Sequence, residues 1–118
     1  MIQKTDLMNF WKENFGFRGA ELKAFREVNR EDFIPESLRN AAYHDVPLPL
    51  LRGKTISQPT TVMIMTHALE LKPGEKVFEI GTGSGYQSAI IAKVVGPKGK
   101  VITTEVVPEL VQFAKQNL

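Results

Sequence analysis

Apolar residues recur with two different periods along the chain, and the change of period separates helices from strands. Helical spacing predicts helices over residues 4–15 and 19–28, and Asn29 and Pro35 are expected to cap and end a short helix. Prolines and a glycine predict an extended loop over residues 41–53. The pattern then predicts a long helix after Pro59, a strand at 76–80, a helix at about 85–95, a strand at 100–106 and a helix after Pro108.

The order of these elements is typical of an α/β fold. Helices come first, and a strand–helix–strand–helix series then predicts a parallel strand pair with a crossover helix. We therefore expect a helical and loop region over residues 1–54 and part of a Rossmann-like domain over residues 55–118. A two-stranded parallel sheet leaves an edge uncovered, and the edge from Lys76 to Ile80 is apolar. We expect the chain to associate with itself through this edge.

The most informative motif is a glycine-rich turn directly after the first of these strands. Gly81, Gly83 and Gly85 follow an apolar run, and a strand–turn–helix of this kind can form a nucleotide cradle. A dinucleotide fingerprint needs glycine where Tyr86 stands, so the pattern favours a nucleoside without a pyrophosphate. Glu105 ends the next strand about twenty residues further on, where a carboxylate can bind ribose hydroxyls. The alternative is a glycine-rich turn that binds no ligand.

Composition argues against several other classes of function. The net charge is +2 and the basic residues are scattered, so nucleic acid is not an expected partner. The absence of cysteine excludes disulfides, cysteine nucleophiles and thiolate metal sites, and it is compatible with a cytoplasmic location. His44 and His67 are far apart, so no metal site is expected, and His67 is interpreted as a surface residue. No apolar run approaches the ~20 residues of a membrane span, and residues 1–6 lack the layout of a secretion signal.

Several segments together resemble the protein-L-isoaspartate O-methyltransferase family, in the family's order. The glycine turn, Glu79-Ile-Gly-Thr-Gly-Ser-Gly-Tyr86, resembles the family's loop for S-adenosylmethionine. Each segment is weak alone, but the combination is highly specific. The other segments are Val28-Asn-Arg-Glu-Asp-Phe-Ile-Pro35, Ala42-Tyr-His-Asp-Val-Pro-Leu-Pro49, Thr55-Ile-Ser-Gln-Pro59, Pro108-Glu-Leu110 and the closing Ala114 to Leu118.

The resemblance implies a truncated S-adenosylmethionine-dependent methyltransferase fold that methylates the carboxylate of L-isoaspartyl residues for protein repair. Ser57 matches the family's active-site serine, although a serine here could also cap the following helix. Glu105 matches the acid that binds the ribose hydroxyls. The full set of residues implied to bind the cofactor is Ile56, Ser57, Glu79, Gly81, Thr82, Gly83, Ser84, Gly85, Glu105 and Val106.

The resemblance covers only the N-terminal portion of the family. A Gly-Asp-Gly segment beside the adenine and further strands have no counterpart here, so we expect weak or absent turnover from this chain alone. Where the family often has a histidine or aromatic residue after Pro59, this chain has Thr60 and Thr61, which bears on the finer contacts to substrate or cofactor. Three functions stay open: a methyltransferase or its N-terminal half, a cofactor-binding module without turnover, and an interaction protein that has lost the site.

Overall fold

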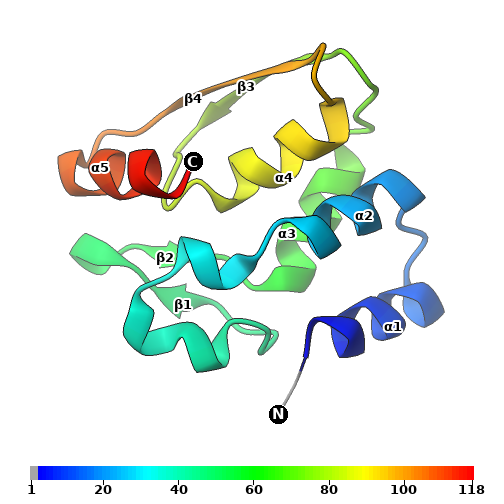
Figure 1. Cartoon of the computed structure of the whole chain (residues 1–118), viewed down its shortest axis with the longest axis horizontal. Helices are drawn as coiled ribbons and strands as arrows, with labels where there is room; N and C mark the ends of the chain where they lie inside the picture. The colour runs from blue at the N-terminus through cyan, green and yellow to red at the C-terminus, as the bar shows by residue number, and fades with distance from the viewer. Residues whose placement is uncertain (1–2) are drawn as a thin grey trace.

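Helices pack on one side of a two-stranded parallel sheet (Figure 1). The computed structural model describes residues 3–118, and Met1 and Ile2, part of the segment without a secretion-signal layout, lie outside the described residues. In chain order the elements are α1 (Lys4–Asn14), α2 (Gly19–Glu27), η1 (Arg30–Phe33), η2 (Glu36–Ala41), β1 (Leu48–Pro49), η3 (Leu51–Gly53), β2 (Thr55–Ile56), α3 (Pro59–Ala68), β3 (Lys76–Ile80), α4 (Tyr86–Val95), β4 (Lys100–Thr104) and α5 (Pro108–Asn117), where η marks a 3-10 helix.

Helix α4 forms the middle layer of the molecule. The β3–β4 sheet lies on one side of α4, and α2 lies on the other (Figure 1). β3 and β4 pair in parallel, with Phe78 opposite Ile102 and Ile80 opposite Thr104. The α/β fold class, the β-α-β-α order and the parallel pair are therefore confirmed.

The outer face of this sheet, which points away from α4, is exposed. Side chains alternate between the two faces of a strand, so Val77 and Glu79 point toward α4 while their neighbours point outward. The outward side chains include large apolar ones, namely Phe78, Ile80 and Ile102, with exposures of 63%, 83% and 48%. Parallel sheets normally bury both faces, so this apolar surface is unusual for such a sheet.

Local interactions at the helix ends explain why the predicted boundaries agree with the structure. α1 begins after Gln3, whose N–H donates to the Asp6 carboxylate at 2.7 Å. α2 begins after Arg18, whose N–H donates to Glu21 at 2.8 Å. Pro59 occupies the first turn of α3, where a missing N–H costs nothing. The predicted ranges of α1, α2 and α4 are each confirmed to within one residue.

Two local predictions are wrong because side chains make other contacts. Asn29 does not cap η1, since its Oδ1 instead accepts a hydrogen bond from the Lys4 ammonium at 2.7 Å. The second strand ends at Thr104 rather than at residue 106. There the Glu105 carboxylate accepts the N–H groups of the next two residues at 3.0 and 3.1 Å, which turns the chain toward α5.

The segment predicted as an extended loop, residues 41–53, is more ordered than expected. Its second half contributes β1 to a small antiparallel ribbon, in which β1 pairs with β2 just beyond the segment. The Leu50 N–H donates to the Lys54 carbonyl at 2.7 Å, and the tight turn between them places Arg52 and Gly53 at φ angles of 59° and 70°. The sequence pattern missed this ribbon because each strand has only two residues.

The core is one cluster of buried side chains that extends from α1 to α5. Trp11 and Phe25 are fully buried and meet edge to face, with ring centroids 4.6 Å apart. Ile90 of α4 and Leu110 of α5 belong to the same cluster. The division of the chain between residues 54 and 55 stays a prediction. Among residues 3–118, no helix has the length and apolar character that crossing a membrane requires.

Candidate cofactor cleft

A cleft lies at the carboxyl ends of β3 and β4, where ligands of open α/β sheets usually bind. The glycine loop (residues 81–85) forms one wall, and the segment that precedes α3 (residues 50–57) forms the opposite wall. Two adjoining cavities of about 250 Å³ and about 440 Å³ make up the cleft, and both are lined by Thr55, Gly81 and Gly83. Their combined size is within the range of small-molecule sites.

The structure brings all the sequence-predicted cofactor residues except Gly85 to this cleft. Gly85 instead lies at the base of α4, where its φ angle is 92° and an added Cβ would lie 3.0 Å from the Leu118 side chain. The smaller cavity is lined by Ile56, Ser57, Glu79, Gly81, Thr82, Gly83 and Ser84, and the larger one by Gly81, Gly83, Glu105 and Val106.

The glycine loop is held in place by backbone hydrogen bonds. The N–H groups of Gly81 and Thr82 both donate to the carbonyl of Thr104 at the end of β4, at 2.8 and 3.0 Å. From the other side, the Asn117 amide donates to the Ser84 carbonyl at 3.0 Å. The φ angles of the three loop glycines lie between 57° and 92°, which other residues adopt only with strain. The turn therefore has a fixed shape that depends on glycine.

Glu105 lies directly against the glycine loop. Its Oε1 accepts the Gly83 N–H at 2.8 Å, and its Oε2 accepts the N–H groups of Val106 and Val107. The Gly83 N–H is the main reason that the pKa of Glu105 is lowered, so this carboxyl is ionised at neutral pH. A carboxylate has about four acceptor positions and Glu105 uses three of them, so it keeps capacity for about one hydroxyl group of a ligand. The sequence predicted the acid but not its bond to the loop.

Ser57 lines the cleft and does not cap α3. The N-cap residue is Gln58, and the Ser57 side chain is exposed and makes no hydrogen bond to any of residues 3–118. The alternative interpretation of Ser57 as a helix cap is therefore wrong. The backbone carbonyl of Ser57 is held from behind by the Arg30 guanidinium at 2.9 Å.

Asp45 supplies the missing cap for α3. Its carboxylate accepts both the N–H and the hydroxyl of Thr60, at 2.9 and 2.5 Å, and the Thr60 hydroxyl in turn accepts the Trp11 indole N–H at 2.9 Å. Thr60 is 8% exposed and does not line the cleft. The threonine that departs from the family pattern therefore joins α1 to α3 in this chain.

Glu79 accepts hydrogen bonds from hydroxyl groups beneath the cleft. The sequence pattern did not predict these partners. Oε1 of Glu79 accepts the hydroxyl of Ser88 and, at 2.7 Å, that of Thr103. The Thr103 hydroxyl also lies 2.5 Å from that of Thr82 in the glycine loop. This network joins β3, β4 and α4 directly beneath the loop. Its sequence signal was weak, since isolated serines and threonines are common on strands and helices.

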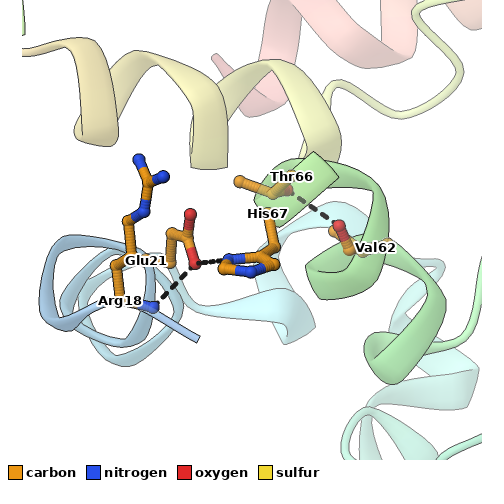
Figure 2. A network of polar contacts seen from close by, with 5 residues as sticks. All are labelled: Arg18, Glu21, Val62, Thr66 and His67. Atoms are coloured by element: carbon orange, nitrogen blue, oxygen red, sulfur yellow. Dashed lines mark hydrogen bonds and ion pairs between the residues drawn. The ribbon is translucent and has the colours of Figure 1, made fainter. Parts of the chain in front are cut away.

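His67 lines neither cavity of the cleft. It pairs with a buried acid (Figure 2). Its side chain is 39% exposed, but its Nδ1 lies 2.9 Å from Oε1 of Glu21, whose side chain is 1% exposed. The interpretation of His67 as a surface residue thus missed a contact that joins α2 to α3. Among residues 3–118, no three His, Cys, Asp or Glu side chains gather in a way that could hold a metal ion.

The comparisons with known proteins agree with this geometry. The model of the protein-L-isoaspartate(D-aspartate) O-methyltransferase family matches residues 3–118. The chain belongs to this family. The resemblance predicted from the sequence is confirmed over almost the whole chain.

Relatives in the family are about twice as long. A protein-L-isoaspartate O-methyltransferase from Methanopyrus kandleri is 53% identical over 118 residues, which are 100% of this chain and 50% of the relative. One from Ignicoccus hospitalis is 46% identical over 117 residues, which are 98% of this chain and 56% of the relative. The chain therefore spans about half the length of the curated relatives that it matches.

Solved structures of the family share this fold. One protein-L-isoaspartate O-methyltransferase aligns with a TM-score of 0.83 and 32% identity, over 98% of this chain and 38% of that one. A family member from Plasmodium falciparum, solved in complex with S-adenosyl-L-homocysteine, aligns with the same TM-score and 28% identity, over 97% of this chain and 53% of that one.

Proposed function

We propose that this chain binds S-adenosylmethionine in the cleft and forms the cofactor-binding part of a protein carboxyl methyltransferase. The observation that carries the proposal is that Ser57, the glycine loop and Glu105 line one cleft in a chain of this family. The residues fit such a ligand: Glu105 is an ionised acceptor suited to ribose hydroxyls, and the glycine loop allows close approach. Ile56 and Val106 offer apolar contacts beside them.

The proposed reaction places few demands on the protein's own groups. When bound, the cofactor supplies a methyl group that passes to a carboxylate oxygen, while the electron pair of the broken carbon–sulfur bond stays on sulfur. No proton moves in this step, so a general base is not required. Ser57 orients the acceptor carboxylate with its unpaired hydroxyl, and the rate gain comes mainly from positioning the two reactants. The family points to L-isoaspartyl residues of proteins or peptides as the substrate class.

The second candidate is cofactor binding without efficient turnover. Ile80 and Val106 stand at the rim of the cleft and are 83% and 93% exposed. Water therefore reaches the place where two opposite charges would have to meet, and methyl transfer between charged groups is favoured when water is excluded. We accordingly propose that this chain alone binds the cofactor but transfers methyl groups weakly.

The exposed outer face of the sheet supports self-association. Phe78, Ile80 and Ile102 form an apolar surface beside the free edge of β3, and such an edge readily pairs with another strand. We propose that two copies meet there. Light scattering after size-exclusion chromatography should give a dimer at micromolar concentration, and Ile80→Lys should convert it to a monomer. A wild-type chain that is monomeric would contradict this. The cytoplasmic location stays a prediction.

Calorimetry and a methyl-transfer assay test the proposed function in two steps. S-adenosyl-L-homocysteine should bind the wild-type chain with one site per chain, and Glu105→Ala should weaken this binding. Methyl transfer from labelled cofactor to an isoaspartyl peptide, with the aspartyl peptide as control, should be detectable but slow. Absence of binding would reject the cofactor-binding proposal, whereas binding without transfer would leave the second candidate.

A further inference from the structure

Arg30 lies fully buried behind the cleft, outside the predicted set of site residues. Its guanidinium Nη1 donates to the Ser57 carbonyl at 2.9 Å, and Nη2 makes a longer contact of 3.4 Å with the Val46 carbonyl. The guanidinium carbon also lies 5.4 Å from the centre of the Tyr86 ring. One side chain of η1 therefore contacts the segments on both sides of the cleft.

This arrangement is costly for a charged group. Arg30 makes no hydrogen bond or ion pair with a carboxylate among residues 3–118, and its Nε has no hydrogen-bond partner there. Burial without a paired charge disfavours the cation, and this is the main reason that the pKa of Arg30 is lowered. Two carbonyls and the face of Tyr86 offset part of the cost. Two of these three partners, Ser57 and Tyr86, line the cleft.

Ser57 and Tyr86 stand on opposite walls of the cleft. Ser57 ends the wall formed by residues 50–57, whereas Tyr86 is the first residue of α4, directly after the glycine loop. Both residues line the smaller cavity, and Arg30 contacts both while lining neither cavity. The Arg30 side chain therefore bridges the two walls.

We infer that Arg30 is a positioning residue that sets the separation between Ser57 and the glycine loop, and thereby the affinity of the cleft for its nucleoside ligand. The inference rests on the proposed function, since it takes the cleft to be the cofactor site. A planar guanidinium can bond to a carbonyl and stack on a ring at once, whereas a lysine ammonium can do only part of this. Arg30→Lys therefore keeps a long basic side chain but removes the simultaneous contact with both walls.

The test is a pair of double-mutant cycles on S-adenosyl-L-homocysteine affinity, measured by calorimetry on the full chain. Arg30→Lys should raise the dissociation constant about tenfold, because the ligand must then order the two walls that Arg30 holds in place in the wild type. Combined with Ser57→Ala, which keeps the carbonyl bonded to Arg30 but removes the hydroxyl that Arg30 positions, the two effects should be less than multiplicative. Combined with Glu105→Gln, at the other end of the cleft, they should multiply. Multiplication in both cycles would overturn the inference.

A destabilising control separates positioning from a general loss of stability. Phe25→Leu alters a fully buried ring that packs on Trp11 and Tyr43 and lines neither cavity. At a temperature where both variants are folded by circular dichroism, Phe25→Leu should bind S-adenosyl-L-homocysteine as the wild type does. Equal weakening in Phe25→Leu and Arg30→Lys would count against the inference.

Hydrogen–deuterium exchange supplies a measurement without ligand. Peptides that cover residues 46–58 and 82–88 should exchange faster in Arg30→Lys than in the wild type. In Phe25→Leu these peptides should exchange at the wild-type rate. If the wild-type chain fails to bind S-adenosyl-L-homocysteine, the cofactor proposal is wrong, and the exchange result alone decides whether Arg30 holds the two walls. Unchanged exchange in both peptides would reject that role.

Discussion

The two walls of the cleft are built in different ways. The glycine loop is held mainly by backbone groups of its own β-α-β unit, such as the Thr104 carbonyl that accepts two loop N–H groups. The wall formed by residues 50–57 is held by side chains from distant parts of the chain, since Arg30 fixes the Ser57 carbonyl and Asp45 caps the helix that follows. The first wall is thus a local structure, whereas the position of the second depends on the docking of the N-terminal region.

This contrast predicts where substitutions are most damaging. Changes to remote side-chain supports should cost more stability than changes within the glycine loop, because the supports join elements that are otherwise separate. Changes within the loop should affect ligand affinity more than stability. Four variants test these expectations, and the free energy of unfolding in urea or on heating is the common measure.

The largest loss of stability is expected for Asp45→Ala. This change removes two hydrogen bonds from Thr60 to Asp45 and leaves the buried Thr60 hydroxyl, which accepts the Trp11 N–H, with no acceptor for its own proton. The loss should be about 3 kcal/mol. Urea denaturation should show the loss, while Asp32→Ala, an exposed carboxylate on η1, should cost under about 0.5 kcal/mol. Equal effects of the two substitutions would mean that the cap of α3 is unimportant.

The next largest effect is expected for His67→Ala. The change leaves the buried Glu21 carboxylate without its side-chain partner, and partial exposure of His67 reduces the cost to about 2 kcal/mol. His67→Gln, which can still donate a hydrogen bond, should recover part of it. Because the pair lies away from the cleft, ligand affinity should stay within about twofold of wild type at temperatures where the variant is folded. A large loss of affinity would show that α2 and the cleft are coupled.

A smaller effect on stability is expected for Gly83→Ala. The added Cβ has space, with Leu50 Cδ1 at 3.8 Å, so the cost comes from the φ angle of 57° and should be about 1 kcal/mol. Gly16→Ala is the matched control, since its Cβ would meet no atom within 4 Å and its φ is not positive. Gly83→Ala should nevertheless weaken ligand binding more than His67→Ala does. The reverse order of affinities would contradict the contrast between the walls.

The smallest effect, and one that depends on pH, is expected for Glu105→Gln. The lowered pKa of Glu105 in the folded chain means that its ionised form contributes stability at neutral pH. This contribution is present above the ordinary pKa of 4.5 and is lost as the pH falls through the lower folded value. Melting temperatures of wild type and variant should therefore differ at pH 7 and converge toward pH 3. A constant difference across this range would show that the charge is not responsible.

The local parts of this molecule could be predicted from its sequence. Helical spacing, Pro59 and the short apolar runs predicted most helices and both strands of the parallel pair, because each signal lies within a few residues. The glycine spacing and Glu105 predicted one wall of the cleft for the same reason. The end of β4 was misplaced because the carboxylate of Glu105 turns the chain, a contact that apolar spacing does not report.

The rest could not be predicted because it depends on pairs far apart in sequence. Trp11 and Thr60 are 49 positions apart, and Arg30 and Ser57 are 27 apart. Nothing in the local pattern at Arg30 distinguishes a buried guanidinium from a solvated one. Local sequence could not decide whether Ser57 caps α3 or belongs to the active site. The structure decides it, because Asp45 caps α3 instead.

The hydrogen bond between Trp11 and Thr60 also gives the molecule an optical reporter. Trp11 is the only tryptophan of the chain, its indole is fully buried, and its N–H ends at the first turn of α3, next to the 50–57 wall. Indole emission shifts to longer wavelength when water replaces such a partner. The fluorescence of the unlabelled protein therefore follows the docking of α1 on α3, and a stopped-flow trace would time the assembly of this wall during refolding.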